Sequence, residues 1–344
     1  MARNDISDLL RRPVVVAPMA GGPSTAELVI AAAGAGAVGF LAAGYKTAPA
    51  MAAEIAAVRA GTAEPFGVNV FVPGCASATP EAVAAYLESL AGDCEAVGCT
   101  LGEATWDEDH FDEKIALLLS DPPSLVSFTF GCPSPEVVAA LHEAGSLVAV
   151  TVTSAAEAAV VTAAGADALC IQGSEAGAHR GSFSNDDLPA PALGLFTLLD
   201  EVPAASRLPL IAAGGIMGPT DVKAVLAAGA KAVQCGTAFL RAPESGAHPV
   251  YKAALADGRF TATALTRAFS GRPARGLVNG FIGRHKVAPA AYPEIDNATR
   301  PLRSAAAAAG DDERMSLWAG TGYRAATERS AGEIVDFLCS KQTG

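Results

Sequence analysis

Residues 209–237 read PLIAAGGIMGPTDVKAVLAAGAKAVQCGT, which is one short apolar run, one Ala-rich stretch and a second apolar run. The runs cover 209–213 and 232–235, and neither alternates apolar with polar residues. A strand that is continuously apolar is buried on both faces, as in a parallel sheet covered by helices. The stretch between them has helix length. We therefore predict a strand–helix–strand unit of an α/β protein.

The same pattern extends toward the N-terminus. Six further apolar runs occur, each followed by sequence long enough for a helix, at 13–17, 37–42, 66–72, 125–130, 147–152 and 168–172. Eight such units predict a closed (β/α)8 TIM barrel more readily than an open doubly wound sheet. The open sheet stays possible at this point, because periodicity does not reveal closure.

Two segments interrupt this repeat. Residues 79–121 separate the third and fourth runs and carry Trp106 beside an acidic stretch. After about residue 256 the repeat ends in a polar, Arg-rich tail. We predict a barrel over 1–256 with 79–121 as an insertion. We expect residues 257–344 to form a cap segment and C-terminal helices that pack, with the insertion, over the barrel mouth.

Composition narrows the class of function. The chain has 344 residues, of which 51% are hydrophobic and 17% charged, enough for a large core. A net charge of −12 disfavours binding to nucleic acid. Neither a signal peptide nor a membrane-spanning run is visible, and the seven cysteines lack zinc-site spacing. We expect a soluble cytoplasmic protein with reduced thiols, as a monomer or a homodimer.

The ends of the last two runs carry small residues suited to an anion. Gly214 and Gly215 follow the seventh run, and Gly236 and Thr237 follow the eighth. Barrels of this class bind phosphate at these two consecutive strand ends, through backbone N–H groups. The alternative is that the glycines only permit tight turns. Both sites together favour a phosphate ligand.

A histidine stands in the most polar of the predicted strand-end loops. His179 lies in QGSEAGAHRG at 172–181, next to Arg180. An isolated histidine is more often structural, but in a loop facing the site an imidazole is suited to take a proton near neutral pH. Glu175 either orients it or is solvated. Cys132 is expected to be an inert buried thiol, and the other four histidines receive no chemical role.

Taken in order, the motifs resemble one family. The stretches are APMAGG at 17–22, GAGAVGFLAAGY at 34–45, FGVNVF at 66–71, SFTFGCP at 127–133, QGSEAGAHRGSF at 172–183, AAGGI at 212–216, VQCGTAFLRAPES at 233–245, YPEIDNATRPLR at 292–303 and MSLWAGTGY at 315–323. The chain resembles the FMN-dependent nitronate monooxygenases, formerly called 2-nitropropane dioxygenases, over nearly its whole length. The histidine loop and the WAG segment are the most specific parts.

The resemblance implies a noncovalent FMN and the oxidation of alkyl nitronates, such as propionate 3-nitronate, with O2 to a carbonyl compound and nitrite. His179 matches the family's catalytic base for neutral nitroalkanes. Tyr292 falls in the C-terminal stretch from which the resemblance implies groups at the substrate. Lys286 and Arg300, chosen for their charge alone, are candidate cations for the nitronate, as is protonated His179. The implied cofactor residues are Ala17, Pro18, Met19, Asn69, Gln172, Gly177, Gly214, Gly215, Gln234, Gly236 and Thr237. Ala178 and Cys132 depart from the family pattern and leave the substrate range open.

Two other readings stay open. The first is an FMN-dependent NAD(P)H enoyl-thioester or quinone reductase on the same fold. A separate dinucleotide fingerprint is not evident, because GAGAVG at 34–39 is predicted to begin inside a helix. The second is a non-catalytic barrel that senses a phosphorylated metabolite.

Overall fold

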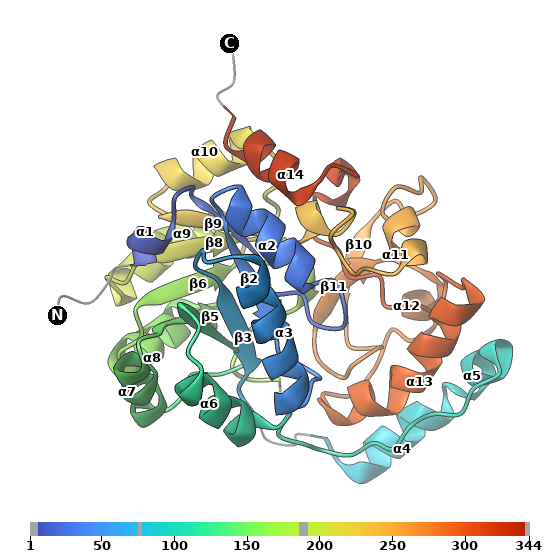
Figure 1. The fold of residues 1–344 in the computed structure, drawn as a ribbon. Coiled ribbons are helices and arrows are strands. Elements are labelled where there is room, and N and C mark those ends of the chain that lie inside the picture. Colours follow the sequence, from blue (N-terminus) through green and yellow to red (C-terminus); the bar gives the residue numbers. More distant parts are fainter. Residues whose placement is uncertain (1–5, 75–77, 186–191, 341–344) are drawn as a thin grey trace.

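A computed structural model describes residues 6–74, 78–185 and 192–340, and its central feature is a closed barrel (Figure 1). Eight parallel strands follow in the order β1-β2-β3-β4-β5-β6-β8-β9, and β9 pairs back to β1. They are β1 (Val14–Val16), β2 (Val38–Ala42), β3 (Gly67–Phe71), β4 (Leu125–Thr129), β5 (Leu147–Val152), β6 (Ala168–Gln172), β8 (Leu210–Ala213) and β9 (Ala232–Cys235). The predicted barrel is confirmed, and the open sheet is excluded by the closing pair.

Helices surround this barrel in chain order. They are α2 (Ala26–Gly34), α3 (Ala48–Gly61), α6 (Phe111–Ser120), α7 (Pro135–Ala144), α8 (Ala155–Ala164), α9 (Leu195–Ala205), α10 (Pro219–Ala227) and α14 (Ala331–Leu338). Five of them begin at a Ser or Thr side chain that accepts a backbone N–H of the first turn, as an N-cap does. The last helix, α14, packs against α2 and α10 and so closes the ring.

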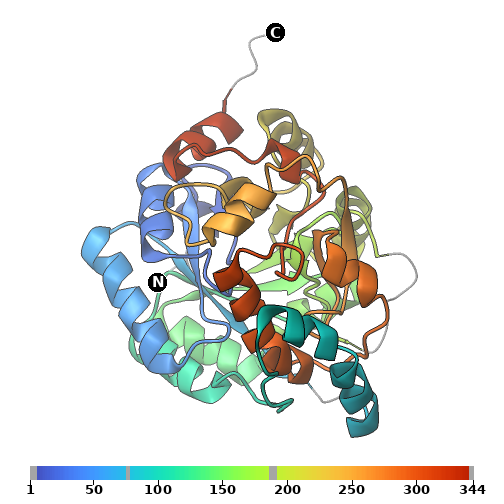
Figure 2. The same cartoon turned by 90° about the vertical axis from the view of Figure 1, so that its right-hand side faces the viewer.

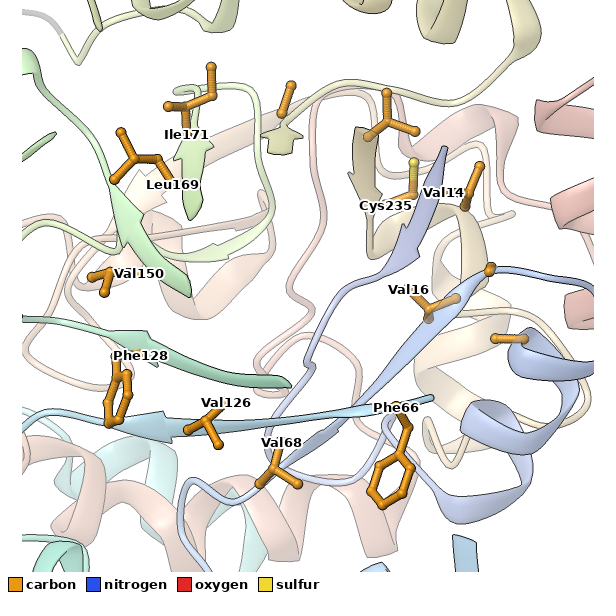
Figure 3. Close-up of a cluster of buried hydrophobic side chains, with 14 of the residues drawn as sticks. Val14, Val16, Phe66, Val68, Val126, Phe128, Val150, Leu169, Ile171 and Cys235 are labelled. Carbon is orange, nitrogen blue, oxygen red and sulfur yellow. The ribbon is translucent and has the colours of Figure 1, made fainter. Parts of the chain in front are cut away.

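Side chains along the strands alternate between two cores. The outward ones, drawn in part in Figure 3, pack under the helices; Val14, Val68, Val126 and Leu169 are examples. The inward ones fill the lower barrel, and α1 (Ile6–Leu9) inserts Ile6 there. At the carboxyl end the inward residues become polar. This change from apolar to polar creates the floor of a site at the end where barrel enzymes carry their chemistry.

The cap is assembled from both irregular segments (Figure 2). These segments supply α4 (Pro80–Glu88), α5 (Ala91–Val97), α12 (Gly280–Arg284) and α13 (Glu294–Ala309). The cap also takes in α11 (Pro249–Ala254), which precedes the second segment. Both α4 and α5 pack against α13. A three-stranded sheet in the order β10-β11-β7 joins the cap to the barrel. Its strands are β7 (Ala178–His179), β10 (Thr263–Thr266) and β11 (Ala274–Leu277).

Buried polar contacts tie the insertion to the tail. Tyr86 of α4 donates a hydrogen bond to the carbonyl of Ala268 at 2.6 Å. Asp93 of α5 contacts Arg284 at 2.5 Å and His285 at 2.7 Å. Residues 79–121 thus give α4 and α5 to the cap but α6 to the helical ring, and residues 257–344 likewise return α14 to the ring.

Among the described residues, no helix is long and apolar enough to cross a membrane.

Candidate active site

A cavity of about 500 Å³ lies at the carboxyl ends of the strands, between the barrel and the cap. We call it the barrel-mouth cavity. This volume lies in the range of small-molecule and cofactor sites. The structure brings His179 and every implied cofactor residue to its wall: Ala17, Pro18, Met19, Asn69, Gln172, Gly177, Gly214, Gly215, Gln234, Gly236 and Thr237.

One end of the cavity is lined by backbone N–H groups. Gly214 and Gly215 turn after β8 with φ of 124° and 73°, a conformation that glycine adopts without strain. Within the described residues, the N–H groups of Gly214, Gly215, Gly236 and Thr237 donate to no other residue. The Thr237 hydroxyl accepts the N–H of Gly320 at 3.0 Å, which leaves its own proton free to donate. Unpaired donors at this place are chemically suited to an anion.

The neighbouring backbone is closely packed. A Cβ on Gly177 would lie 2.5 Å from the backbone nitrogen of Gly320. On Gly215 it would lie 3.2 Å from the Cβ of Glu175. Thr321 donates its N–H to the carbonyl of Glu175 at 3.0 Å. The segment after Trp318 therefore rests directly on the histidine loop, and the glycines are needed for that approach.

Polar side chains form the floor of the cavity. Asn69 donates from Nδ2 to the hydroxyls of Ser127 at 2.8 Å and Thr129 at 3.0 Å. Gln172 donates to the carbonyl of His179 at 3.0 Å and accepts the N–H of Gly181 at 2.8 Å. Gln172 thus fixes the histidine loop as well as lining the cavity.

His179 is held by the small sheet that joins the barrel to the cap. It pairs with Ala274 of β11, and the preceding Ala178 has a left-handed φ of 62°. Three aromatic rings surround the imidazole. The ring centroids of Phe130, Tyr292 and Trp318 lie 5.8, 5.6 and 5.5 Å from its own. The histidine is therefore placed in the cavity wall inside an aromatic enclosure.

The imidazole is neutral at physiological pH. Burial lowers the pKa of His179 from 6.5 to about 4, and the charges of Arg272 and Arg303 lower it further, whereas Asp296 opposes the change. Nε2 of His179 lies 2.8 Å from Oγ of Ser270. A neutral imidazole in the cavity wall is a proton acceptor.

Glu175 has a role that neither sequence reading anticipated. Its carboxylate accepts the N–H of Leu195 at 3.0 Å, at the beginning of α9. The carboxylate caps a helix whose N-terminal N–H groups lack partners of their own. The orienting role is wrong, because the described partner of His179 is Ser270. The Glu175 side chain is half-buried, so it is partly solvated as well.

A second cavity, of about 970 Å³, adjoins the first, and we call it the outer cavity. Tyr292 lines it, and its hydroxyl donates to that of Tyr45 at 3.2 Å. Arg300 lines both cavities and lies above the Tyr45 ring. Lys286 follows α12, is exposed, and lines neither of these two cavities. The structure therefore brings Tyr292 and Arg300 to the site, but not Lys286.

Several lining or enclosing residues were not anticipated from the sequence. Ser270, Arg272, Tyr45 and Trp318 were given no role, although Trp318 belongs to the WAG segment that carried the resemblance. Arg272 is buried, lies 4.0 Å above the Phe130 ring, and forms no ion pair with another described residue. The sequence carried no signal that separates Ser270 and Arg272 from the other polar residues of the Arg-rich tail.

Two further expectations concern the Cys132 thiol and the GAGAVG segment at 34–39. Burial raises the pKa of the Cys132 thiol, consistent with an unreactive side chain. Helix α2 ends at Gly34 and β2 begins at Val38, so GAGAVG does begin inside a helix. Among the described residues, no group of His, Cys, Asp and Glu is arranged to hold a metal ion.

Fold and site together define a (β/α)8-barrel enzyme with unpaired backbone donors and a half-buried neutral histidine at one cavity. The model of the nitronate monooxygenase family matches residues 3–341. The chain belongs to the nitronate monooxygenase family and is an oxidoreductase.

Individual relatives are similar to this chain over nearly its whole length. A nitronate monooxygenase of Pseudomonas aeruginosa is 38% identical over 346 residues, covering 97% of each chain. A probable nitronate monooxygenase of Bacillus subtilis is 36% identical over 340 residues, covering 96% of each. The crystal structure of a nitroalkane oxidase from Streptomyces ansochromogenes is 50% identical, with a TM-score of 0.94 over 97% of this chain and 96% of that one. FabK from Thermotoga maritima is more distant, at 27% identity and a TM-score of 0.72, over 98% and 95%.

Proposed function

We propose that this enzyme is an FMN-dependent nitronate monooxygenase that oxidises alkyl nitronates, such as propionate 3-nitronate, with O2 to a carbonyl compound and nitrite. The observation that carries the proposal is the convergence of His179 and all the implied cofactor residues on one cavity. Relatives whose names describe oxidation of nitronates or nitroalkanes support the same reaction.

The chain's residues fit FMN. The unpaired N–H groups of Gly214, Gly215, Gly236 and Thr237 suit the terminal phosphate. Ala17, Pro18 and Met19 offer a flat wall for the ring system, and the close packing at Gly177 and Gly215 leaves no room there for larger residues. Asn69, Gln172 and Gln234 supply amides for ring and ribityl oxygens and nitrogens. Bound FMN supplies the electron acceptor and the reaction with O2.

His179 would act before oxidation when the substrate is a neutral nitroalkane. Its neutral ring takes the proton from the carbon next to the nitro group, and the substrate becomes a nitronate. The negative charge left on the substrate offsets the cost of a buried imidazolium. A preformed nitronate needs no base. The enzyme then only has to bind the anion, keep water out with the aromatic enclosure, and supply cations such as Arg300.

Substrate binding is assigned to the aromatic side of the cavity. Tyr292 contacts the His179 ring and lines the outer cavity. Lys286 is omitted from this proposal because it lines neither cavity.

A visible spectrum of the purified protein tests the cofactor and the reaction together. We expect a yellow flavin spectrum that anaerobic propionate 3-nitronate bleaches quickly and NADH bleaches slowly. Fast bleaching by NADH alone would instead favour the reductase reading. Absence of flavin, even after incubation with FMN, would refute the cofactor assignment.

The variant His179→Asn tests the base. General base catalysis contributes about 10²–10⁴-fold, so activity on neutral nitroalkanes should fall by that factor. Activity on the preformed nitronate should change little. Full activity of the variant on a neutral nitroalkane would refute the role of His179, without affecting the flavin assignment.

A further inference from the structure

Ser270 lies in the turn between β10 and β11, and its side chain is fully buried. Its hydroxyl is the hydrogen-bond partner of His179, at 2.8 Å from Nε2. The two segments are joined independently of this contact, because His179 pairs with Ala274 and Arg180 donates its N–H to the carbonyl of Pro273 at 2.8 Å. The backbone therefore positions the hydroxyl against the ring.

The direction of that hydrogen bond follows from counting protons. A serine hydroxyl has one proton to donate. Ser270 Oγ lies 3.2 Å from the carbonyl oxygen of Arg272, which can only accept. Among the described residues this carbonyl has no other donor, and a buried carbonyl without a partner costs about 1–3 kcal/mol. Ser270 therefore donates to the carbonyl and accepts from His179.

Consequently the neutral imidazole carries its proton on Nε2. The lone pair lies on Nδ1, which forms no hydrogen bond with another described residue. His179 itself lines the barrel-mouth cavity, so Nδ1 is the ring nitrogen that remains for a substrate.

We propose that Ser270 is a positioning residue that fixes His179 in the Nε2–H form and so makes Nδ1 the proton acceptor. This inference rests on the proposed role of His179 as the base. In the reaction the C–H bond of the nitroalkane breaks, its electron pair stays on the substrate as the nitronate, and the proton forms a new N–H bond at Nδ1. The resulting imidazolium keeps donating from Nε2 to Ser270, and no hydrogen bond has to be exchanged.

The charges around the ring come from two elements of the cap. Arg272, in the same turn as Ser270, disfavours the imidazolium, as does Arg303 of α13. Asp296 of α13 favours it. Tyr292 packs on the ring as a neutral phenol, because burial raises its pKa well above 10. None of these groups hydrogen bonds to the ring, so the choice of tautomer is left to Ser270.

The experiment compares three variants of the enzyme as purified. Ser270→Ala removes the hydroxyl and Ser270→Thr retains one. Ser146→Ala is the matched control, since Ser146 is equally buried and donates to the carbonyl of Pro123 at 2.6 Å just before β5, at the far end of the barrel. The measurements are kcat/KM with nitroethane and with preformed ethylnitronate. Selective 15N-histidine NMR reports the protonation of each ring nitrogen.

For Ser270→Ala we expect kcat/KM on nitroethane to fall by about 10–100-fold, less than the loss of a complete base. Activity on ethylnitronate should stay near that of the unchanged enzyme. The His179 nitrogen signals should change from one tautomer to a mixture, and Ser270→Thr should restore both readouts. Ser146→Ala should leave both unaltered.

Unchanged nitroethane activity and an unchanged Nε2–H signal in Ser270→Ala would overturn the inference. Equal losses on nitroethane and ethylnitronate would also overturn it, because they would show an effect on the cavity rather than on the base. Failure of the proposed function is distinguishable. In that case His179→Asn retains nitroethane activity, whereas the NMR signals of Ser270→Ala still report the tautomer.

Discussion

Replacing Lys114 by Met should lower the stability of the enzyme more than breaking any single ion pair on its surface. The Lys114 side chain in α6 is fully buried, and its Nζ lies 2.7 Å from Oδ2 of Asp109. The Asp109 side chain is 20% exposed, and its Oδ1 accepts the N–H of Tyr45 at 2.9 Å. Burial lowers the pKa of Lys114 and raises the pKa of Asp109, so both charges are partly desolvated.

Lys114→Met leaves the Asp109 carboxylate without its counterion. Removing one partner of a buried pair costs about 3–5 kcal/mol, and the residual exposure of Asp109 places our expectation at about 3 kcal/mol. With an unfolding entropy of about 2 cal/mol/K per residue, this corresponds to a Tm lower by about 4 °C. Differential scanning calorimetry is the measurement.

Two controls separate the charge effect from loss of packing. Adding Asp109→Asn to Lys114→Met removes both charges and keeps an acceptor for Tyr45, so it should recover most of the loss. Arg12→Met breaks a surface pair with Asp336, whose side chain is 66% exposed, and should cost under about 1 kcal/mol. If the double variant is as unstable as Lys114→Met, or if Lys114→Met melts like the unchanged enzyme, the reasoning is refuted.

Two further predictions concern the cofactor and acid stability. A Cβ on Gly236 would meet Ala17 Cβ at 3.4 Å and Met19 Sδ at 3.5 Å, which are ordinary contacts. Gly236→Ala should therefore fold normally yet bind FMN at least tenfold more weakly in fluorescence titrations, about 1.4 kcal/mol. Gly215 has a φ of 73°, a left-handed conformation that costs an alanine about 1–2 kcal/mol. Gly215→Ala should therefore lose that much stability in addition. His179 protonates near pH 6.5 when unfolded but near 4 when folded, so stability should fall by about 3 kcal/mol as pH drops through that window. His179→Asn should flatten this slope in urea titrations at pH 6.5 and 4; an unchanged slope would contradict the assignment.

The barrel was predictable because its strands are buried on both faces. Continuous apolar runs such as 147–152 leave a parallel sheet as the simplest solution, and the carboxyl ends of such strands necessarily converge. That convergence explains why residues as distant as Asn69 and Thr237 could be placed at one cavity. The helical pattern did not reveal that α6 and α14 join the ring, because periodicity identifies an apolar face but not what covers it.

The environment of His179 was less predictable, since it depends on contacts made across the cap. Ser270 is 91 residues away in sequence, and the turn that carries it has no regular period. Glu175 was considered because it is near in sequence, yet its carboxylate faces the start of α9. Lys286 was considered for its charge alone, which carries no information on direction.

The position of α14 has a consequence for the order in which the chain is made. In the finished ring α14 covers surface of α2 and α10, and α14 begins about 300 residues after α2 in the sequence. At about 5–20 residues per second, that surface of α2 stays bare for about 15–60 s of synthesis on the ribosome. The nascent barrel is therefore most exposed to aggregation, and most in need of a chaperone, until α14 leaves the exit tunnel.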